Sequence, residues 1–324
     1  MAARLNPAPS RPVEIIDLRR IAARDMDSLL EEETRAWKEQ LDWDFEKSAD
    51  LVRRFVDLRA LNGAALIENG EVVGYLYYVL EENKGLIGDL YVMDAFRTWE
   101  RETALVETGL EAIIANPAVV RIESQLMMLR YQPGLRLPWP DHLGCYERHF
   151  MRINLQDASL DENRVRRPVH IEKWSDQNQD LAATLIGIAY SGHVDSRIND
   201  QYRSTAGARR FLYNVMQYPG CGSFYRPASY AAFDAATGEL CGISLASLVS
   251  PECGHITQIC VSPDVRGAGV GHALLRHSLG TLHAMGCRTA SLTVTGSNQE
   301  AINLYERMGF RTVRRFYAFV WEGF

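Results

Sequence analysis

The apolar and polar positions of this chain repeat once along its 324 residues. A turn containing Gly and Glu precedes an apolar stretch with an internal Gly at 69–79 (NGEVVGYLYYV) and again at 237–247 (TGELCGISLAS). Residues 85–106 (GLIGDLYVMDAFRTWERETALV) then align without a gap with residues 254–275 (GHITQICVSPDVRGAGVGHALL). Because the pattern occurs in only two copies, it indicates a duplicated domain rather than a solenoid.

The two copies predict the same order of elements. Apolar stretches at 13–18 and 169–174 open the copies as strands. One or two helices, three strands, a helix, a fifth strand, a further helix and the final strands follow in each copy. The Asn69–Gly70 pair predicts a hairpin with a primed turn. A helix in the second copy is predicted by apolar residues with a 3.6-residue period, at Val270, Leu274, Leu275, Leu279, Leu282 and Met285.

The same pattern suggests where the domains begin and end. We expect a disordered arm at 1–12, a first domain at 13–155, a linker at 156–167 and a second domain at 168–324. The linker is polar and charged and leads directly into a proline, as connections between domains often do.

Composition excludes several classes of protein. The chain is 47% hydrophobic and carries a net charge of −6, with 19 basic and 27 acidic side chains in residues 1–160. This charge is not the basic footprint of a nucleic-acid binder. No apolar run approaches the ~20 residues of a membrane span. The six cysteines stand at no metal-ligand spacing, so we expect reduced thiols and no metal site. Since the first residues lack the apolar core of a signal peptide, we expect a cytoplasmic protein without nucleic-acid or membrane partners.

One glycine-rich stretch suggests chemistry. Arg266, Gly267, Ala268, Gly269, Val270 and Gly271 stand between a predicted strand and the start of a predicted helix. Glycines permit positive φ, and a helix N-terminus offers free N–H groups and a positive dipole end. Together they suit a phosphate or pyrophosphate, to which the arginine can add a charge-assisted hydrogen bond.

Two nucleotide-binding motifs do not fit this stretch. A nucleoside-triphosphate loop needs Gly-Lys-Ser/Thr at its end, whereas His272 follows Gly271 here. A dinucleotide fingerprint needs the spacing G-x-G-x-x-G, whereas this loop reads G-x-G-x-G.

Val261–Gly271, with its V-x-P before R-G-x-G-x-G, resembles the acetyl-CoA loop of the GNAT acetyltransferase superfamily. Asn298–Phe310 (NQEAINLYERMGF) is similar to the N-x-x-A-x-x-L-Y-x-x-x-G-F signature of that family. The resemblance implies an α/β (α+β) fold class: two tandem GNAT-like domains, each a mixed, mostly antiparallel sheet flanked by helices. It implies acetyl-CoA as cosubstrate, bound by the loop 266–271 and by strand backbone at Ile259, Cys260 and Val261.

The resemblance also assigns roles on the second signature. Tyr305 would protonate the leaving thiolate of CoA, and Asn298 would lie near the pantetheine arm. The residues themselves also allow simpler interpretations. Tyr305 can be a tyrosine of the buried helix face, and Asn298 can be a helix N-cap. Ser297 with Glu300 also fits a capping box.

The sequence leaves several candidates for the general base. Many relatives carry an acid three residues before the valine of V-x-P, but Gln258 stands there and cannot accept a proton. His255, Glu252, His193, Asp195 or a water chain are candidates. Relatives build the acceptor site between the first two strands of the domain. There this chain has the polar and aromatic residues Tyr190, His193, Asp195, Asn199, Asp200, Tyr202 and Tyr218.

The first copy lacks the glycine loop. Thr98, Glu100 and Glu102 align with the three loop glycines, and only Arg97 is kept. Two carboxylates at this place would repel a pyrophosphate. We therefore expect a degenerate first domain that has lost CoA binding, supports the second domain and forms one side of the acceptor cleft.

The resemblance thus implies an acetyl-CoA-dependent N-acetyltransferase in which an amine attacks the thioester directly. The acceptor would be a primary amine of a small molecule or of a peptide or protein, and the protein a monomer or homodimer. The alternative is a regulatory module that binds acyl-CoA without turnover.

Overall fold

The computed structural model describes residues 13–158, 165–218 and 220–324, so the arm predicted at 1–12 and much of the predicted linker lie outside the described residues. The described chain forms two compact units. Unit 1 comprises Met1–Arg35, Ala49–Gly144 and Val320–Phe324, as far as these are described. Unit 2 comprises Ala36–Ser48 and Cys145–Phe319.

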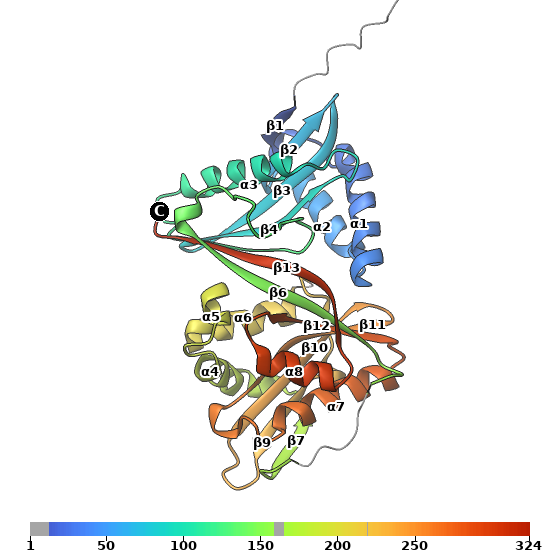
Figure 1. Cartoon of the computed structure of the whole chain (residues 1–324), viewed down its shortest axis with the longest axis vertical. Helices are drawn as coiled ribbons and strands as arrows, with labels where there is room; N and C mark the ends of the chain where they lie inside the picture. Colours follow the sequence, from blue (N-terminus) through green and yellow to red (C-terminus); the bar gives the residue numbers. More distant parts are fainter. Residues whose placement is uncertain (1–12, 159–164, 219) are drawn as a thin grey trace, which may run out of the picture. The chain divides into compact units, whose positions relative to one another are not determined.

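Unit 1 is built on the strands of the first copy in the order β1-β2-β3-β4-β5 (Figure 1). Of these pairings only β4–β5 is parallel. The strands are β1 (Glu14–Asp17), β2 (Asn62–Glu68), β3 (Glu71–Glu81), β4 (Lys84–Val92) and β5 (Arg121–Leu126). The helices are α1 (Asp27–Leu41), whose last turns belong to unit 2, α2 (Glu46–Asp57) and α3 (Trp99–Ile114).

Alternate residues of β3 show how the helices cover both faces of this sheet. The hydroxyl of Tyr75 donates to the Glu33 carboxylate of α1 (3.0 Å). Leu76, on the opposite face, lies against Gly109 of α3. The period of two along a strand thus separates two helix layers around one sheet.

Unit 2 is built on a sheet with the order β13-β6-β12-β11-β10-β9-β7, and the short β8 pairs with β10. The strands are β6 (Leu143–Asn154), β7 (Val169–Lys173), β8 (Ser223–Phe224), β9 (Tyr230–Asp234), β10 (Leu240–Ser250), β11 (Cys253–Val261), β12 (Thr289–Thr295) and β13 (Arg311–Glu322). The helices are α4 (Gln179–Ala189), α5 (Asp195–Ile198), α6 (Thr205–Gln217), α7 (Val270–Ala284) and α8 (Gln299–Arg307). Strands β11 and β12 pair in parallel, whereas the pairings of β10 with β8, β9 and β11, of β7 with β9 and of β6 with β12 are antiparallel.

The faces of the unit 2 sheet are covered in the same way (Figure 1). The hydroxyl of Ser244 on β10 lies 2.8 Å from that of Ser278 on α7. Ile243 and Leu245, which alternate with it, pack with α4 and α6 in a separate buried cluster. Helix α8 packs with α7, β6 and β12 in the largest described cluster of this unit.

Two segments of the first copy belong to unit 2. Strand β6 runs antiparallel to β12, from Arg148 opposite Thr295 to Asn154 opposite Thr289. The segment 36–48 brings in Trp43, which contacts the rings of Phe150 and His255. Unit 2 therefore contains residues from both copies of the repeat.

Most elements predicted from the sequence are confirmed. Asn69 and Gly70 have φ of 54° and 88°, as a primed turn requires. The helix predicted after the fifth strand of the first copy is wrong, because only the 3₁₀ turn at Pro140–His142 occurs between β5 and β6. Met285 is also not on the apolar face of α7, since it caps the helix and is 60% exposed.

A glycine at the same place in each copy sets the distance between strand and helix. A Cβ on Gly85 of β4 would lie 2.5 Å from Ile113 of α3. A Cβ on Gly254 of β11 would lie 2.5 Å from Leu282 of α7. Both contacts are shorter than atoms tolerate, so the helices pack closely because these positions have no side chain.

This close approach predicts coupling between Gly254 and Leu282. We expect Gly254→Ala to lower the free energy of unfolding by about 1–3 kcal/mol through overpacking, and Leu282→Ala by about 2–5 kcal/mol through a cavity. In the double variant the added methyl group fills part of the cavity, so the loss is smaller than the sum. Chemical denaturation measures all three. Gly280→Ala on α7 meets open space and should be neutral or slightly stabilising. Strictly additive losses would contradict the contact.

Candidate active site

The candidate site lies where the two parallel strands of unit 2 separate. Strands β11 and β12 pair only from Cys253–Thr289 to Ile256–Leu292. The register between β10 and β11 shifts there, because Leu245 faces Gln258 and Ala246 faces Ile256. This bulge turns the rest of β11 away from its parallel neighbour. The ends 257–261 of β11 and 293–295 of β12 do not pair with each other, and we call the place between them the strand opening.

The backbone of β11 presents hydrogen-bonding groups to the strand opening. The N–H of Ser262 donates to the Cys241 carbonyl of β10 (2.8 Å). Since backbone groups alternate in direction along a strand, those of Cys260 also face β10, and those of Ile259 and Val261 face the strand opening. The thiol of Cys260 packs in the cluster with α4 and α6, and burial raises its pKa to about 12, so it is an inert thiol at neutral pH.

The glycine loop leads from β11 into α7 with free donors at its end. Gly267 and Gly269 have φ of 73° and 90°, which confirms the need for glycine. Gly269 is the N-cap and offers no side chain to accept from the first turn, whose first intrahelical bond runs from Ala273 to Gly269 (3.0 Å). The N–H groups of Val270, Gly271 and the following residue therefore have no intrahelical acceptor. This arrangement fits an anion such as a pyrophosphate.

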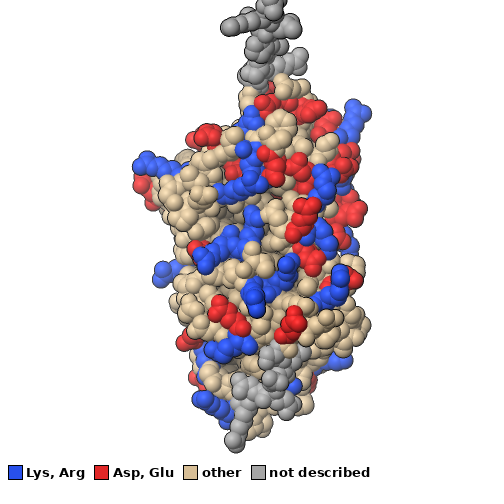
Figure 2. Space-filling view, turned by 45° about the vertical axis from the view of Figure 1, so that its right-hand side comes forward, with Lys and Arg blue, Asp and Glu red and all other residues tan. Residues whose placement is uncertain are grey.

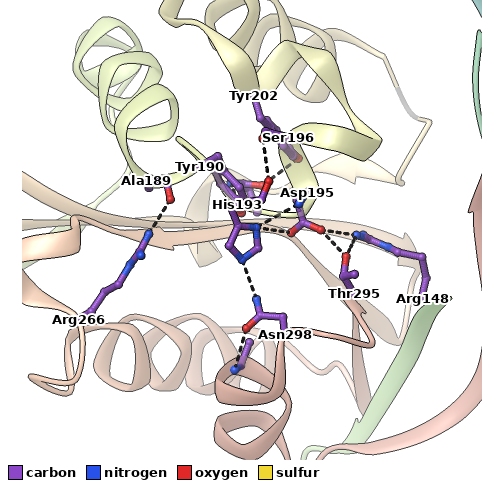
Figure 3. Close-up of polar contacts among 12 residues, drawn as sticks. Arg148, Ala189, Tyr190, His193, Asp195, Ser196, Tyr202, Arg266, Thr295 and Asn298 are labelled. Carbon is purple, nitrogen blue, oxygen red and sulfur yellow. Dashed lines mark hydrogen bonds and ion pairs between the residues drawn. The ribbon is translucent and has the colours of Figure 1, made fainter. Parts of the chain in front are cut away.

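Two residues of the loop have partners of their own. The guanidinium of Arg266 donates to the Ala189 carbonyl at the end of α4 (2.6 Å; Figure 3). The Ala268 N–H bonds the Val265 carbonyl (3.2 Å), and the Ala268 carbonyl accepts from Arg166. Contacts of Arg266 and Ala268 with a bound anion remain predictions.

Helix α8 begins at the other side of the strand opening. The side chain of Asn298 accepts from the Ala301 N–H (3.2 Å), which confirms it as the N-cap. The capping box expected from Ser297 is therefore wrong by one position. Tyr305, on the buried face of α8, is 7% exposed and lies beside Phe310. Burial raises the pKa of Tyr305 well above its usual value, so its phenol is a proton donor at neutral pH.

Gln258, which cannot act as a base, holds two tyrosines in place. It is buried on β11, and its amide donates to the Tyr190 hydroxyl (3.0 Å) while it accepts from the Tyr202 hydroxyl (3.3 Å). The two tyrosine rings stack with centroids 4.5 Å apart. Gln258, Tyr190 and Tyr202 thus form one hydrogen-bonded group at the strand opening, which we call the tyrosine wall.

His193 and Asp195, two of the four candidate bases, lie together near this wall (Figure 3). His193 Nε2 lies 3.4 Å from the amide nitrogen of Asn298, and His193 Nδ1 lies 3.6 Å from the Asp195 carboxylate. Asp195 also accepts from Arg148 (2.8 Å) and from the Thr295 hydroxyl. Four of the seven expected acceptor-site residues therefore meet here, whereas Asn199 caps a 3₁₀ turn and Tyr218 is 61% exposed.

The other two candidate bases lie elsewhere. His255 is in the paired part of β11, buried against Trp43 and Phe150 and bonded to the Ser291 hydroxyl (2.9 Å). Glu252 precedes β11, pairs with Arg288 and is some 25–30 Å along the strand from the loop, at about 3.3 Å per residue. Neither is placed to take a proton at the strand opening.

In the first copy the place of the loop is filled. Thr98 caps α3 by accepting from Arg101 (3.3 Å), and Glu100 and Glu102 stand in its first turn. Arg97, the counterpart of Arg266, donates to the Val92 carbonyl (2.8 Å) and lies 3.6 Å from Glu102. The donors at the start of α3 already face negative groups of their own chain.

Sequence reasoning missed Arg148 and Thr295. Arg148 lies on the last strand of the first copy, and no local sequence pattern predicts that this strand pairs with β12. The repeat of the sequence does contain a signal for Asp89. The same 169-residue offset that aligns the two loops places Asp89 of β4 opposite Gln258, so the acid absent from the second copy stands in the first. Asp89 is buried, and burial raises its pKa to about 6.

Three further observations bear on partners. On the face shown in Figure 2, basic and acidic side chains are interspersed. Among the described residues, no helix is both long and apolar enough to cross a membrane. The described chain also holds no cluster of His, Cys, Asp and Glu that could bind a metal ion.

The site combines a separating parallel strand pair, a glycine loop at a helix start and a buried tyrosine on the next helix. Residues 197–310 match the model of the Acetyltransferase (GNAT) family. This part of unit 2 is therefore similar to the GNAT acetyltransferases.

Solved structures share the fold over almost the whole chain. A GCN5-related N-acetyltransferase from Sphaerobacter thermophilus has a TM-score of 0.66 at 20% identity and covers 95% of both chains. A tandem GNAT protein from the clavulanic acid biosynthesis pathway has a TM-score of 0.58 at 16% identity, over 96% of this chain and 98% of the other. These similarities confirm the predicted tandem GNAT-like fold.

Curated relatives are similar to about a quarter of the chain. The [ribosomal protein bS18]-alanine N-acetyltransferase of Escherichia coli is 38% identical over 82 residues, 25% of this chain and 55% of that protein. The mycothiol acetyltransferase of Streptomyces avermitilis is 38% identical over 76 residues, 23% of this chain and 25% of that protein. The chain thus spans about half or less of the length of these relatives.

The buried His255 predicts how stability depends on pH. Burial lowers the pKa of His255 to about 4, below the ~6.5 of an exposed imidazole. Its contribution is fully present above pH ~6.5 and is lost as the pH falls toward 4, because only the unfolded chain takes up the proton. Between pH 7.5 and 5 the native chain should lose about 2 kcal/mol more stability than His255→Gln. Chemical denaturation at both values measures this. His170→Gln, at an exposed histidine, should behave like wild type. Equal losses in wild type and His255→Gln would contradict the buried neutral ring.

Proposed function

We infer that the chain is an acetyl-CoA-dependent N-acetyltransferase whose working site is in unit 2. The acceptor is a primary amine of a small molecule or of a peptide or protein. The observation that carries this inference is the uncapped start of α7, where two glycines with positive φ leave N–H groups free beside the strand opening. The family model that matches residues 197–310 and the acetyltransferase relatives support it.

The cosubstrate is bound by the glycine loop and by the backbone of β11. The loop 266–271 and the first turn of α7 hold the pyrophosphate of the cosubstrate. The backbone groups of Ile259 and Val261 bind the pantetheine and donate to the oxygen of the thioester carbonyl, where charge develops during attack. Cys260 contributes only through its place between them, since its own backbone groups face β10. Asn298 borders the same arm.

Tyr305 is the general acid of the proposed reaction. Attack by an amine forms the new N–C bond, and the C–S bond then breaks and leaves a thiolate that needs a proton. Burial keeps the phenol protonated at neutral pH. Among the described residues the Tyr305 hydroxyl has no hydrogen-bond partner, so it is available to donate.

The first copy has a supporting role in this proposal. The start of α3 carries Thr98, Glu100 and Glu102 instead of glycines, so it offers no cradle to a second CoA. Its contribution is structural, through the segments that belong to unit 2. The alternative function, a module that binds acyl-CoA without turnover, takes its support from Gln258 in the usual position of the base.

The loop assignment predicts the effect of a carboxylate at Gly269. Acetyl-CoA should raise the melting temperature of the wild type, and Gly269→Glu should abolish that rise, because a carboxylate repels the pyrophosphate. Gly286→Glu is the control. Gly286 has nearly the same φ (94° against 90°) and open space around it, but lies at the far end of α7. A preserved shift in Gly269→Glu would refute the loop as the CoA site.

Turnover tests the enzyme against the binding module. A screen for thiol release from acetyl-CoA should include amines, polyamines, aminoglycosides and peptides with a free N-terminus. With an accepted amine, Tyr305→Phe should lower kcat roughly 10²-fold while acetyl-CoA still shifts the melting temperature. Tyr230→Phe removes another buried hydroxyl of unit 2, bonded to Thr281, and should leave kcat near wild type. If none of the tested amines supports thiol release, the binding module is favoured. Unchanged turnover in Tyr305→Phe would show that Tyr305 is not the acid.

A further inference from the structure

His193 connects the two sides of the strand opening (Figure 3). Its ring stands edge-on to Tyr190, with centroids 5.4 Å apart, and the Tyr190 hydroxyl is bonded to Gln258 on the unpaired part of β11. On the other side, His193 Nε2 lies 3.4 Å from Asn298, the residue that begins α8 after β12. A substrate between the ends of β11 and β12 therefore lies next to this imidazole.

Asp195 is held behind His193 by two further residues. Arg148 Nη1 donates to Asp195 Oδ1 (2.8 Å) and to the Thr295 hydroxyl (2.6 Å), and that hydroxyl also bonds Asp195. The side chains of Arg148 and Asp195 are only 12% and 16% exposed. A charge pair with so little access to water and a second hydrogen bond keeps one position, unlike a surface ion pair.

Hydrogen-bond donors face both ring nitrogens of His193. Asn298 uses its oxygen to cap α8, so its NH₂ group faces His193 Nε2. Nδ1 accepts from the backbone N–H of Asp195 (3.2 Å) and lies 3.6 Å from Asp195 Oδ2, which is a charge contact beyond hydrogen-bond length. With the lone pair on Nε2, the ring can accept a proton at the strand opening.

We propose that His193 is the general base of unit 2, and that Asp195 and Arg148 are the positioning residues that orient it. The proposal rests on the acetyltransferase function proposed above and assigns the proton acceptor that Gln258 cannot be. Arg148 lies on β6, so the last strand of the first copy supplies part of the acid–base machinery of the second.

In the proposed step, His193 takes a proton from the amine and Tyr305 gives one to the sulfur. The amine nitrogen forms a bond to the acetyl carbon and gives its proton to Nε2 of His193. The C–S bond breaks, and the sulfur takes the proton of the Tyr305 hydroxyl. Solvent removes the proton from the imidazolium and restores the one on Tyr305, so the products are the acetamide and free CoA thiol. Asp195 stabilises the imidazolium, as the third group does when it orients a catalytic base.

The base is tested with an amine accepted in the thiol-release screen. His193→Ala should lower kcat/KM by about 10²–10⁴-fold while the acetyl-CoA melting shift persists. The acidic limb of the wild-type pH profile should disappear, and added imidazole should restore part of the rate. The groups that face or neighbour His193 and could contribute limbs are Asp195, Arg148, Tyr190, Tyr202 and Tyr305. His283→Ala, at an exposed histidine in the last turn of α7, is the control and should match wild type.

The positioning residues are tested by graded variants. Asp195→Asn should lower kcat on the order of 10- to 100-fold, because the imidazolium formed in the reaction loses a neighbouring anion. Arg148→Met should lower kcat similarly, and Arg148→Lys, which keeps the charge, should recover part of it. The KM for acetyl-CoA should stay near wild type in all three.

Each outcome decides between the proposals. An active wild type with a nearly unaffected His193→Ala would overturn the base and leave the acetyltransferase function intact. A wild type that turns over no amine would overturn both. If His193→Ala loses the acetyl-CoA melting shift, His193→Gln is measured in its place and must show the same loss of kcat/KM. Equal activities of Arg148→Met and wild type would remove Arg148 from the site.

Discussion

The separation of β11 from β12 is the constraint on which the rest of unit 2 depends. A fully paired parallel sheet would consume the backbone groups of Ile259 and Val261 in its own ladder. The bulge after Ile256 ends that ladder early and leaves the groups unpaired between two helix starts. The loop before α7, the cap of α8 and the tyrosine wall on Gln258 all border the same place. Substrate binding would complete hydrogen bonds that the fold itself leaves open.

The polar residues around this opening form one connected set rather than separate contacts. Gln258 fixes Tyr190, Tyr190 borders His193, and His193 stands between Asp195 and the cap of α8. A carboxylate in place of Gln258 would be a charge buried beside two phenols, which is costly without a cation. An amide can satisfy both hydroxyls there, while the charged pair of Asp195 and Arg148 lies at the edge where some water reaches it. The chain thus keeps a charge out of this buried position.

Much of this could be predicted from the sequence, and the limits have physical causes. The glycine loop, the hairpin at Asn69–Gly70 and the helix with Tyr305 each rest on local rules of backbone geometry and period, and each was found. The helix expected after β5 was inferred from the symmetry of the repeat, which the chain does not keep. Arg148 and Thr295 could not be found, because they meet through strand pairing across more than a hundred residues. The choice among four candidate bases likewise needed burial, which places His255 inside the core and His193 beside the opening.

The place of β6 and of segment 36–48 has a consequence for the independence of the two copies. A duplicated domain whose copies fold separately can lose one copy without harm to the other. Here the copy that lacks the loop supplies Trp43 and Phe150 to the core of unit 2 and a strand to its sheet. Removal of that copy would take a strand and two core aromatic residues from unit 2, so the second copy alone would not form the same unit. The segments 36–48 and 145–154 therefore tie the first copy to unit 2 although it lacks the glycine loop.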